Sequence, residues 1–201
     1  MSGRDKMQQV TGRRLYSLTE FYRIIYLSLR TRKYLSKAQR NGCMDTRVVE
    51  RIMLAVTEVN ECPLCSYAHT KFALEAGMSS GEIQNLLAGS TDTVPDDEIA
   101  AVMFAQHYAD SRGNPSKETW QHIVDAYGET KAQGILGAVR MIMFGNTFGI
   151  VLNSLKNRFV GKPDKRSNPL YEISMILAFT PFLPVALIHA LMSDLLGSEI
   201  I

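Results

Sequence analysis

Helical spacing of apolar residues recurs along most of this 201-residue chain, whereas the alternation typical of β-strands is nearly absent. One segment shows the spacing clearly. Asp45 or Thr46 can cap a helix there, and that helix ends before Cys62. Its apolar residues return at three- and four-residue steps, at Val48, Val49, Ile52, Met53, Val56 and Val59. The chain is therefore predicted to be all-α.

Boundary signals divide the rest of the chain into further helices. Ser79 and Glu82 have the spacing of a capping box, and the acidic run at 96–98 suits the positive start of another helix. Helices are also predicted around residues 120–127 and over 130–159. The last of these contains the small residues Gly145, Asn146 and Gly149, which favour a close crossing with a neighbouring helix, with a kink as the alternative.

Composition indicates one globular domain with additions at both ends. With 46% hydrophobic and 21% charged residues, the chain can bury a core of its own. The net charge of +2 conceals an asymmetry, because residues 1–40 hold ten lysines or arginines and only two acids. We therefore expect a basic amphipathic helical arm (1–40), a central helical domain with a CxxC motif (41–160) and an apolar helical tail (161–201).

The basic arm has an apolar helical face. Leu15, Leu18, Tyr22, Ile25 and Leu29 recur at helical steps, with arginines on the other side. A membrane surface, a nucleic acid or a transit receptor could each use such a helix. Packing on the protein's own domain or on a second subunit is the simpler interpretation, since spacing indicates packing and not a partner. We expect no nucleic-acid partner.

The number of cysteines and the first forty residues indicate the cellular compartment of the protein. Three cysteines are too few for the disulfide frameworks of small secreted domains. Charged residues interrupt every apolar run in the first forty positions, so no secretory signal is evident. A reducing, cytoplasmic setting is the prediction.

The tail carries no formally charged residue over the 21 positions 173–193, which is long enough for a helix to span about 30 Å of hydrocarbon. Pro181 and Pro184 are expected to break that helix near its middle, and His189 gains nothing from lipid. A pair of terminal helices buried in an oligomer is therefore expected, and membrane insertion is the alternative.

The dithiol Cys62 and Cys65 is the strongest chemical signal in the chain. The two cysteines are separated by two residues at a predicted helix start, where Pro63 fits the first turn. Their sulfurs can therefore alternate between dithiol and disulfide. Free N–H groups and the dipole at this terminus favour the reactive thiolate, most strongly at Cys62 because it is nearest the end.

His69 and Glu50 complete a candidate relay. His69 follows the cysteines by seven and four residues, which returns it to the same helical face. There it can take up a thiol proton, stabilise a thiolate or protonate a leaving group. Glu50 borders the buried face of the preceding helix, where a carboxyl group needs a partner, and His69 is in position to be that partner.

Written together, these residues form E-x11-C-x2-C-x3-H, which resembles the signature of the alkylhydroperoxidase D-like family of the carboxymuconolactone decarboxylase superfamily. The resemblance covers residues 46–159 and implies an all-α helical bundle that assembles as a homotrimer or hexamer. It implies an antioxidant oxidoreductase that reduces a peroxide or disulfide substrate, with a lipoyl-bearing or thioredoxin-like protein as reductant. The superfamily's decarboxylases usually lack the cysteine pair, so lactone decarboxylation is not expected.

The resemblance also implies roles for the four site residues. Cys65 would attack the peroxide, Cys62 would resolve the intermediate, and Glu50 with His69 would relay the proton. The position of Cys62 at the helix terminus favours the opposite order, so the order of attack stays open. Some peroxidases of the family have histidine where this chain has Leu64, which favours weak peroxidase or general disulfide reductase activity here.

Other classes compete for the same residues. Zinc could be held by the two motif cysteines and His69 with Cys43 as a fourth ligand, but zinc knuckles usually place CxxC in a turn, and zinc leaves Glu50 without a role. A c-type haem is disfavoured because Ser66 stands where C-x-x-C-H requires histidine. We expect no metal and no cofactor. A membrane or interaction module built from the arm and tail is the third alternative, and it can coexist with catalysis.

Overall fold

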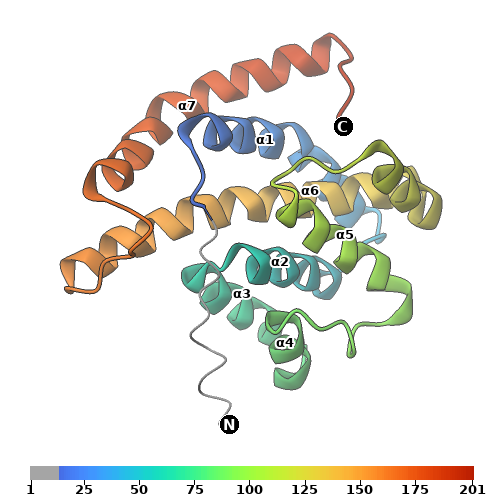
Figure 1. The fold of residues 1–201 in the computed structure, drawn as a ribbon. Coiled ribbons are helices and arrows are strands. Elements are labelled where there is room, and N and C mark those ends of the chain that lie inside the picture. Colours follow the sequence, from blue (N-terminus) through green and yellow to red (C-terminus); the bar gives the residue numbers. More distant parts are fainter. Residues whose placement is uncertain (1–13) are drawn as a thin grey trace.

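The computed structural model describes residues 14–201, and helices are the only regular elements in that range (Figure 1). This confirms the all-α prediction. In chain order the elements are α1 (Leu18–Arg40), α2 (Thr46–Asn60), α3 (Pro63–Glu75), α4 (Ser80–Leu87), the short 3-10 helix η2 (Asp96–Glu98), α5 (Ile99–Asp110), α6 (Lys117–Phe159) and α7 (Pro169–Leu195).

The long helix α6 runs through the middle of the molecule, and α1, α2, α3, α5 and α7 pack on it (Figure 1). On one side α1 lies between α6 and α7; on the other side α2, α3 and α5 contact α6. The main apolar core lies between α2, α5 and α6, with Leu54, Phe104, Ile135 and Leu136 almost or fully enclosed. The dithiol helix α3 thus has α2 on one side and α6 on the other.

Side-chain caps start most of these helices where the sequence predicts. Asp45 accepts from the backbone of Val48 to begin α2, and Ser79 accepts from the backbone of Glu82 to begin α4. A capping box between Ser17 and Glu20 begins α1. The described part of the basic arm is therefore a helix packed on its own domain, while residues 1–13 of that arm lie outside the described range.

A bend at Gly128 divides α6. Its backbone angles are φ 71° and ψ 159°, far from helical values and in a region that suits glycine. The predicted gap between the helices at 120–127 and 130–159 falls at this residue. The second part, from 130 onward, carries the small residues that approach the dithiol.

The expected break at Pro181 and Pro184 was wrong, because α7 is a single helix through both. Both prolines lie on its exposed side. The carbonyl groups freed by a missing proline N–H therefore face outward, where water can satisfy them, and the helix continues.

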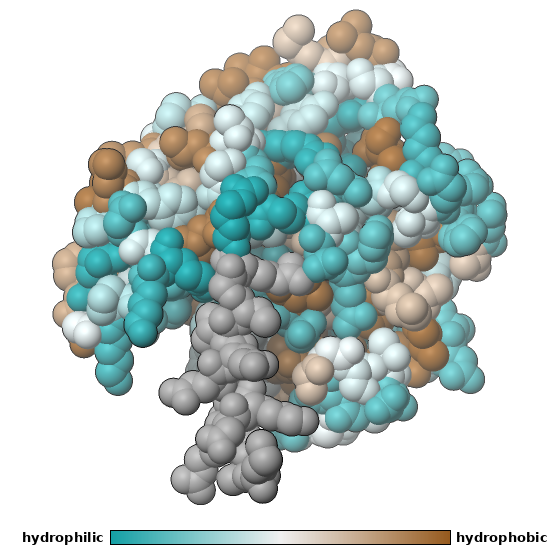
Figure 2. Space-filling model, in the orientation of Figure 1, coloured by the Kyte–Doolittle hydropathy of each residue, from teal (hydrophilic) through white to brown (hydrophobic). Residues whose placement is uncertain are grey.

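The outer side of α7 is apolar and exposed, as the hydrophobic patches along the upper edge in Figure 2 show. By length and composition alone, α6 and α7 are the two helices of the described chain able to cross a membrane. The apolar stretch of α6 is mostly buried inside the protein, whereas that of α7 is mostly not. Exposed side chains on α7 include Leu170, Leu177, Val185, Ile188, Leu191 and Leu195.

A buried ion pair attaches the start of α7 to the end of α6. The side chain of Glu172 is fully enclosed, and its two carboxylate oxygens accept from Arg158 at 2.8 and 2.7 Å. Ser167 donates a further hydrogen bond to the same carboxylate. The hydrogen bonds from Arg158 hold the pKa of Glu172 below its ordinary value, against the opposing effect of burial.

Candidate active site

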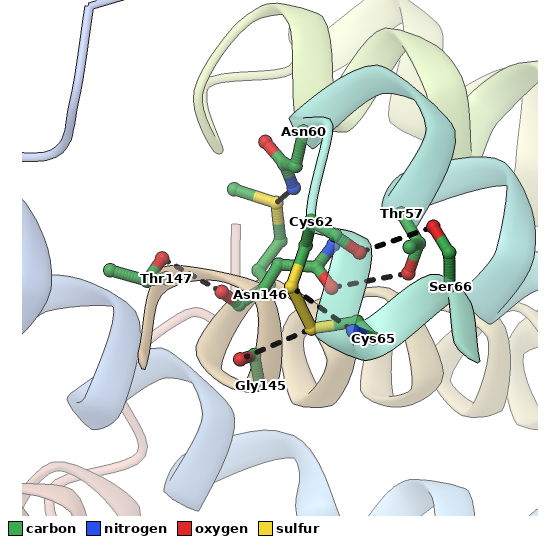
Figure 3. Close-up of a disulfide and its surroundings, with 9 residues drawn as sticks. Thr57, Asn60, Cys62, Cys65, Ser66, Gly145, Asn146 and Thr147 are labelled. Atoms are coloured by element: carbon green, nitrogen blue, oxygen red, sulfur yellow. Dashed lines mark hydrogen bonds between the residues drawn. A yellow bond between two sulfur atoms is a disulfide. The ribbon is translucent and has the colours of Figure 1, made fainter. Parts of the chain in front are cut away.

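Cys62 and Cys65 form a disulfide at the amino terminus of α3, as Figure 3 shows. The left-handed backbone of Glu61, at φ 53°, ends α2 and turns the chain into α3. Cys62 is the cap of α3, and its sulfur accepts from the backbone N–H of Cys65 at 3.3 Å. Pro63 occupies the first helical turn, as predicted. The cysteine pair therefore lies where a helix terminus favours negative charge on sulfur.

Both sulfurs pack directly against α6. A Cβ atom added to Gly149 would lie 2.7 Å from the Cys65 sulfur and 2.9 Å from the Cys62 sulfur, closer than atoms can approach. The Cys65 sulfur also lies 3.6 Å from the carbonyl oxygen of Gly145. The predicted close crossing on α6 is thus the contact that holds the dithiol.

The two sulfurs differ in accessibility. Cys62 is fully buried, whereas Cys65 retains 8% of its surface. Ile150 of α6 packs against both cysteines, and Leu15, just before α1, packs against the same cluster. Cys65 is therefore the more exposed residue of the pair, although both cysteines are buried.

The segment that covers the cysteines is held by several contacts. The Tyr16 hydroxyl donates to Asn60 at 2.6 Å, and the Tyr171 hydroxyl donates to the Tyr16 carbonyl at 2.8 Å. The guanidinium of Arg112 lies 4.1 Å from the centre of the Tyr16 ring. Sequence reasoning placed this segment on a helix and missed its position over the cysteines, because contacts between residues so far apart in the chain leave no local pattern.

His69 and Glu50 meet as the sequence predicted. The Nδ1 atom of His69 lies 2.8 Å from a carboxylate oxygen of Glu50, and both side chains are mostly buried. His69 follows Cys65 by one helical turn on α3, and Glu50 reaches it from α2. The ring of Phe72 packs edge-on against His69. An imidazole held this way can exchange protons beside the dithiol while the carboxylate fixes its orientation.

Cys43, considered above as a metal ligand, is exposed in the turn between α1 and α2. Within residues 14–201, no three His, Cys, Asp or Glu side chains are grouped closely enough to hold a metal ion. The two motif cysteines are bonded to each other, so their sulfurs are not available as thiolate ligands in this state.

The fold and this geometry define the class: an all-helical protein with a CxxC pair at a helix start and a histidine–carboxylate pair one turn away. The model of the carboxymuconolactone decarboxylase family matches residues 28–108, which contain Glu50, Cys62, Cys65 and His69. This match over residues 28–108 is consistent with the alkylhydroperoxidase D-like family of that superfamily. Comparisons with curated proteins and with solved structures found no match.

Proposed function

We propose that this protein is a thiol-dependent oxidoreductase that reduces a peroxide or a disulfide at the Cys62–Cys65 pair. The observation that carries the proposal is the dithiol at the start of α3 with the His69–Glu50 pair on the next turn of the same helix. The match of residues 28–108 to a family of enzymes supports it. A CxxC pair supports thiol chemistry over decarboxylation.

In the proposed cycle the Cys65 thiolate attacks the distal oxygen of a hydroperoxide, because Cys65 is the more exposed residue of the pair. The O–O bond breaks, Cys65 becomes a sulfenic acid, and His69 supplies the proton that converts the departing alkoxide into an alcohol. The Cys62 thiolate then attacks the sulfenic sulfur, and hydroxide leaves as water after protonation. A disulfide substrate follows the same route through a mixed disulfide.

An external dithiol must restore the reduced state, because each turnover consumes two electrons from the cysteine pair. We propose a lipoyl-bearing or thioredoxin-like protein for this step. Leu64, next to Cys65, is 44% exposed and adds no acid or base, which favours disulfide reduction or weak peroxidase activity over rapid peroxide turnover. A cytoplasmic location suits a thiol that must be kept reduced.

We also propose that the protein is a homo-oligomer, a trimer or a hexamer. The outward apolar surface of α7 is the observation in favour, because exposed apolar patches of this kind usually mark an interface. Light scattering of the purified protein without detergent tests this assembly. A monomer that enters the soluble fraction only with detergent would instead support membrane binding through 173–193.

The redox proposal is tested by counting thiols in the reduced protein under argon before and after one equivalent of cumene hydroperoxide. We expect loss of two thiols and a mass decrease of about 2 Da, which corresponds to one new disulfide. The Cys65→Ser variant should not form this bond, and Cys43→Ser should behave like the unchanged protein.

Oxidised lipoamide or oxidised glutathione replaces the hydroperoxide in a second reaction of the same design. Disulfide formation with these oxidants but not with cumene hydroperoxide would identify a disulfide reductase. Two thiols that persist at Cys62 and Cys65 under every oxidant, together with stoichiometric zinc by metal analysis, would contradict the proposal.

A further inference from the structure

Asn146 on α6 buries a hydrogen-bond donor that has no acceptor. The residue is fully enclosed, and its side-chain oxygen accepts from the hydroxyl of Thr57 at 3.1 Å. Its amide nitrogen, Nδ2, makes no hydrogen bond. Burying a donor without an acceptor costs free energy, because the donor loses its hydrogen bond to water. Such groups are therefore few in folded proteins, and each one needs a physical explanation.

The position of Asn146 supplies that reason. Its neighbour Gly145 directs a carbonyl oxygen toward the Cys65 sulfur, and Gly149, one turn later, contacts both sulfurs. Thr57, which holds the Asn146 oxygen, also accepts the backbone N–H of Cys62 at 3.5 Å through its own carbonyl. Figure 3 draws the Asn146 side chain beside the disulfide, between α6 and the end of α2.

The surroundings of the two sulfurs favour negative charge on Cys62. The Cys62 sulfur already accepts from the N–H of Cys65 at the helix terminus. The Cys65 sulfur instead lies near the Gly145 carbonyl, which can accept from a thiol but repels a thiolate. A disulfide sulfur is a weak acceptor, whereas a thiolate is a strong one, so reduction of the bond would offer a stronger acceptor beside the unpaired Nδ2.

We infer that Asn146 donates a hydrogen bond to the Cys62 thiolate when the disulfide is reduced, and so stabilises the buried sulfur in its charged form. The inference rests on the proposed function and assigns Cys62 the part of resolving and leaving thiolate. It reconciles the two arguments about the cysteines, because access favours attack at Cys65 while the charge is best held at Cys62.

This hydrogen bond would assist two steps. In the oxidative step the Cys62 thiolate attacks the Cys65 sulfenic acid, forming the S–S bond and releasing hydroxide. In the reductive step a thiolate of the external dithiol attacks Cys65, the S–S bond breaks, and its electron pair leaves on Cys62. A stabilised leaving thiolate departs faster and shifts the equilibrium toward the reduced pair.

Other charged groups around the site also act on the sulfurs. They are His69 on α3, Glu50 on α2, and Glu61 in the turn that leads to Cys62. Arg14, Arg112 and Arg166 line a cavity next to Leu15 and Ile150, the residues that cover the cysteines. Residues 145–151 of α6 contribute no charged or titratable side chain. Their polar side chains are Asn146 and Thr147, and the Thr147 hydroxyl already bonds to the Met143 carbonyl, whereas Asn146 Nδ2 has no acceptor.

The test follows alkylation of each cysteine in the reduced protein as a function of pH, with peptide mass spectrometry to separate Cys62 from Cys65. Asn146→Leu keeps the approximate volume and removes the donor, and Asn146→Ala is a milder variant if the first folds poorly. Thr147→Val is the matched control, because Thr147 is equally buried and its hydroxyl bonds only to the Met143 carbonyl. Circular dichroism and denaturant unfolding check the fold of each.

In both Asn146 variants we expect Cys62 to react about tenfold more slowly below its midpoint pH, the effect of losing one charge-assisted hydrogen bond. Cys65 should change less, and Thr147→Val should match the unchanged protein. In glutathione buffers, the Asn146 variants should also keep the Cys62–Cys65 disulfide at a higher ratio of reduced to oxidised glutathione than the unchanged protein does.

An unchanged Cys62 pH profile in a folded Asn146 variant would overturn the inference, as would an equal shift in Thr147→Val. The measurement needs no turnover. A protein inert toward hydroperoxide and disulfides, but with the shifted Cys62 profile, would refute the proposed function and leave the role of Asn146 standing.

Discussion

Two regions of the molecule each bury a glutamate, and the partner decides what each carboxylate can do. Glu172 at the α6–α7 junction is fully enclosed and bonded through both oxygens to Arg158. Glu50, on α2, is almost as well buried and faces His69 of α3. Arginine keeps its charge at all relevant pH values, whereas histidine gains and loses a proton near neutrality.

The difference separates a structural ion pair from one to which the proposed function assigns proton transfer. The pair at Glu172 lies on the segment outside the family match and joins two helices permanently. The pair at Glu50 lies inside the matched segment, one turn from the dithiol, where a movable proton is useful. Mutation of either glutamate should therefore affect a different property of the protein.

The largest expected effect is on stability, in Glu172→Gln. The change removes the buried carboxylate that pairs with Arg158, and it should lower the free energy of unfolding at pH 7 more than any other substitution named here, as measured by urea unfolding. Reactivity of the dithiol should hardly change. A loss of stability no larger than that of an ordinary surface substitution would show that the Glu172–Arg158 pair does not stabilise the fold.

The pH dependence of that loss has a definite sign. Because the folded-state pKa of Glu172 is below its ordinary value of 4.5, the pair's contribution is fully present above about pH 4.5. It declines as the pH falls from there through the folded-state pKa. The gap between the unchanged protein and Glu172→Gln should therefore be constant from pH 6 to 8 and narrow in acid; a gap that persists undiminished in acid would contradict this.

A smaller effect is expected at α6, which both regions contact. Gly149→Ala places a methyl group against both sulfurs, and we expect it to be about 2 kcal/mol less stable than Gly145→Ala, by the cost of overpacking. Gly145 is the matched control because an added Cβ there meets its nearest atom at an ordinary 3.6 Å, and both changes gain similar helix propensity.

The same pair of glycine variants tests the site. Gly149→Ala should slow closure of the Cys62–Cys65 disulfide, since the methyl group occupies the space of the sulfurs, while Gly145→Ala should not. Equal stability and equal closure rates in the two variants would show that the sulfurs do not rest on α6.

The smallest expected effect in free energy is the rate change in Glu50→Gln. Glutamine can still accept from His69, so the free energy of unfolding should fall by less than about 1 kcal/mol. Hydroperoxide-driven or disulfide-driven thiol loss should slow about tenfold, about 1.4 kcal/mol in the barrier, because an uncharged partner stabilises the imidazolium less. Stopped-flow thiol oxidation measures this rate.

Glu75→Gln on α3 is the control for Glu50→Gln, because Glu75 is exposed and pairs only weakly with Lys71 at 3.8 Å. It should leave both the rate and the stability unchanged. An unaltered rate in Glu50→Gln would remove Glu50 from the relay and make its pair with His69 as structural as that of Glu172.

Much of the candidate site could be predicted because it is local in sequence. Cys62, Cys65 and His69 share one helix, so the period of the helix alone brings them to one face. Glu50 lies on the adjacent helix after a short turn, which limits where it can point. What could not be predicted was the set of residues opposite the sulfurs, because Leu15 and Asn146 come from distant parts of the chain.

The sequence by itself determined that the protein is helical, where most helices begin, and which side chains form the candidate site, since these follow from spacing, caps and residue type within a few turns. Only the tertiary structure decided that α7 continues through Pro181 and Pro184, that Cys62 is the buried sulfur, and that Gly149 contacts the dithiol. Those outcomes depend on how segments far apart in the chain pack against one another. Burial and steric contact arise from that packing, so no local sequence pattern reveals them.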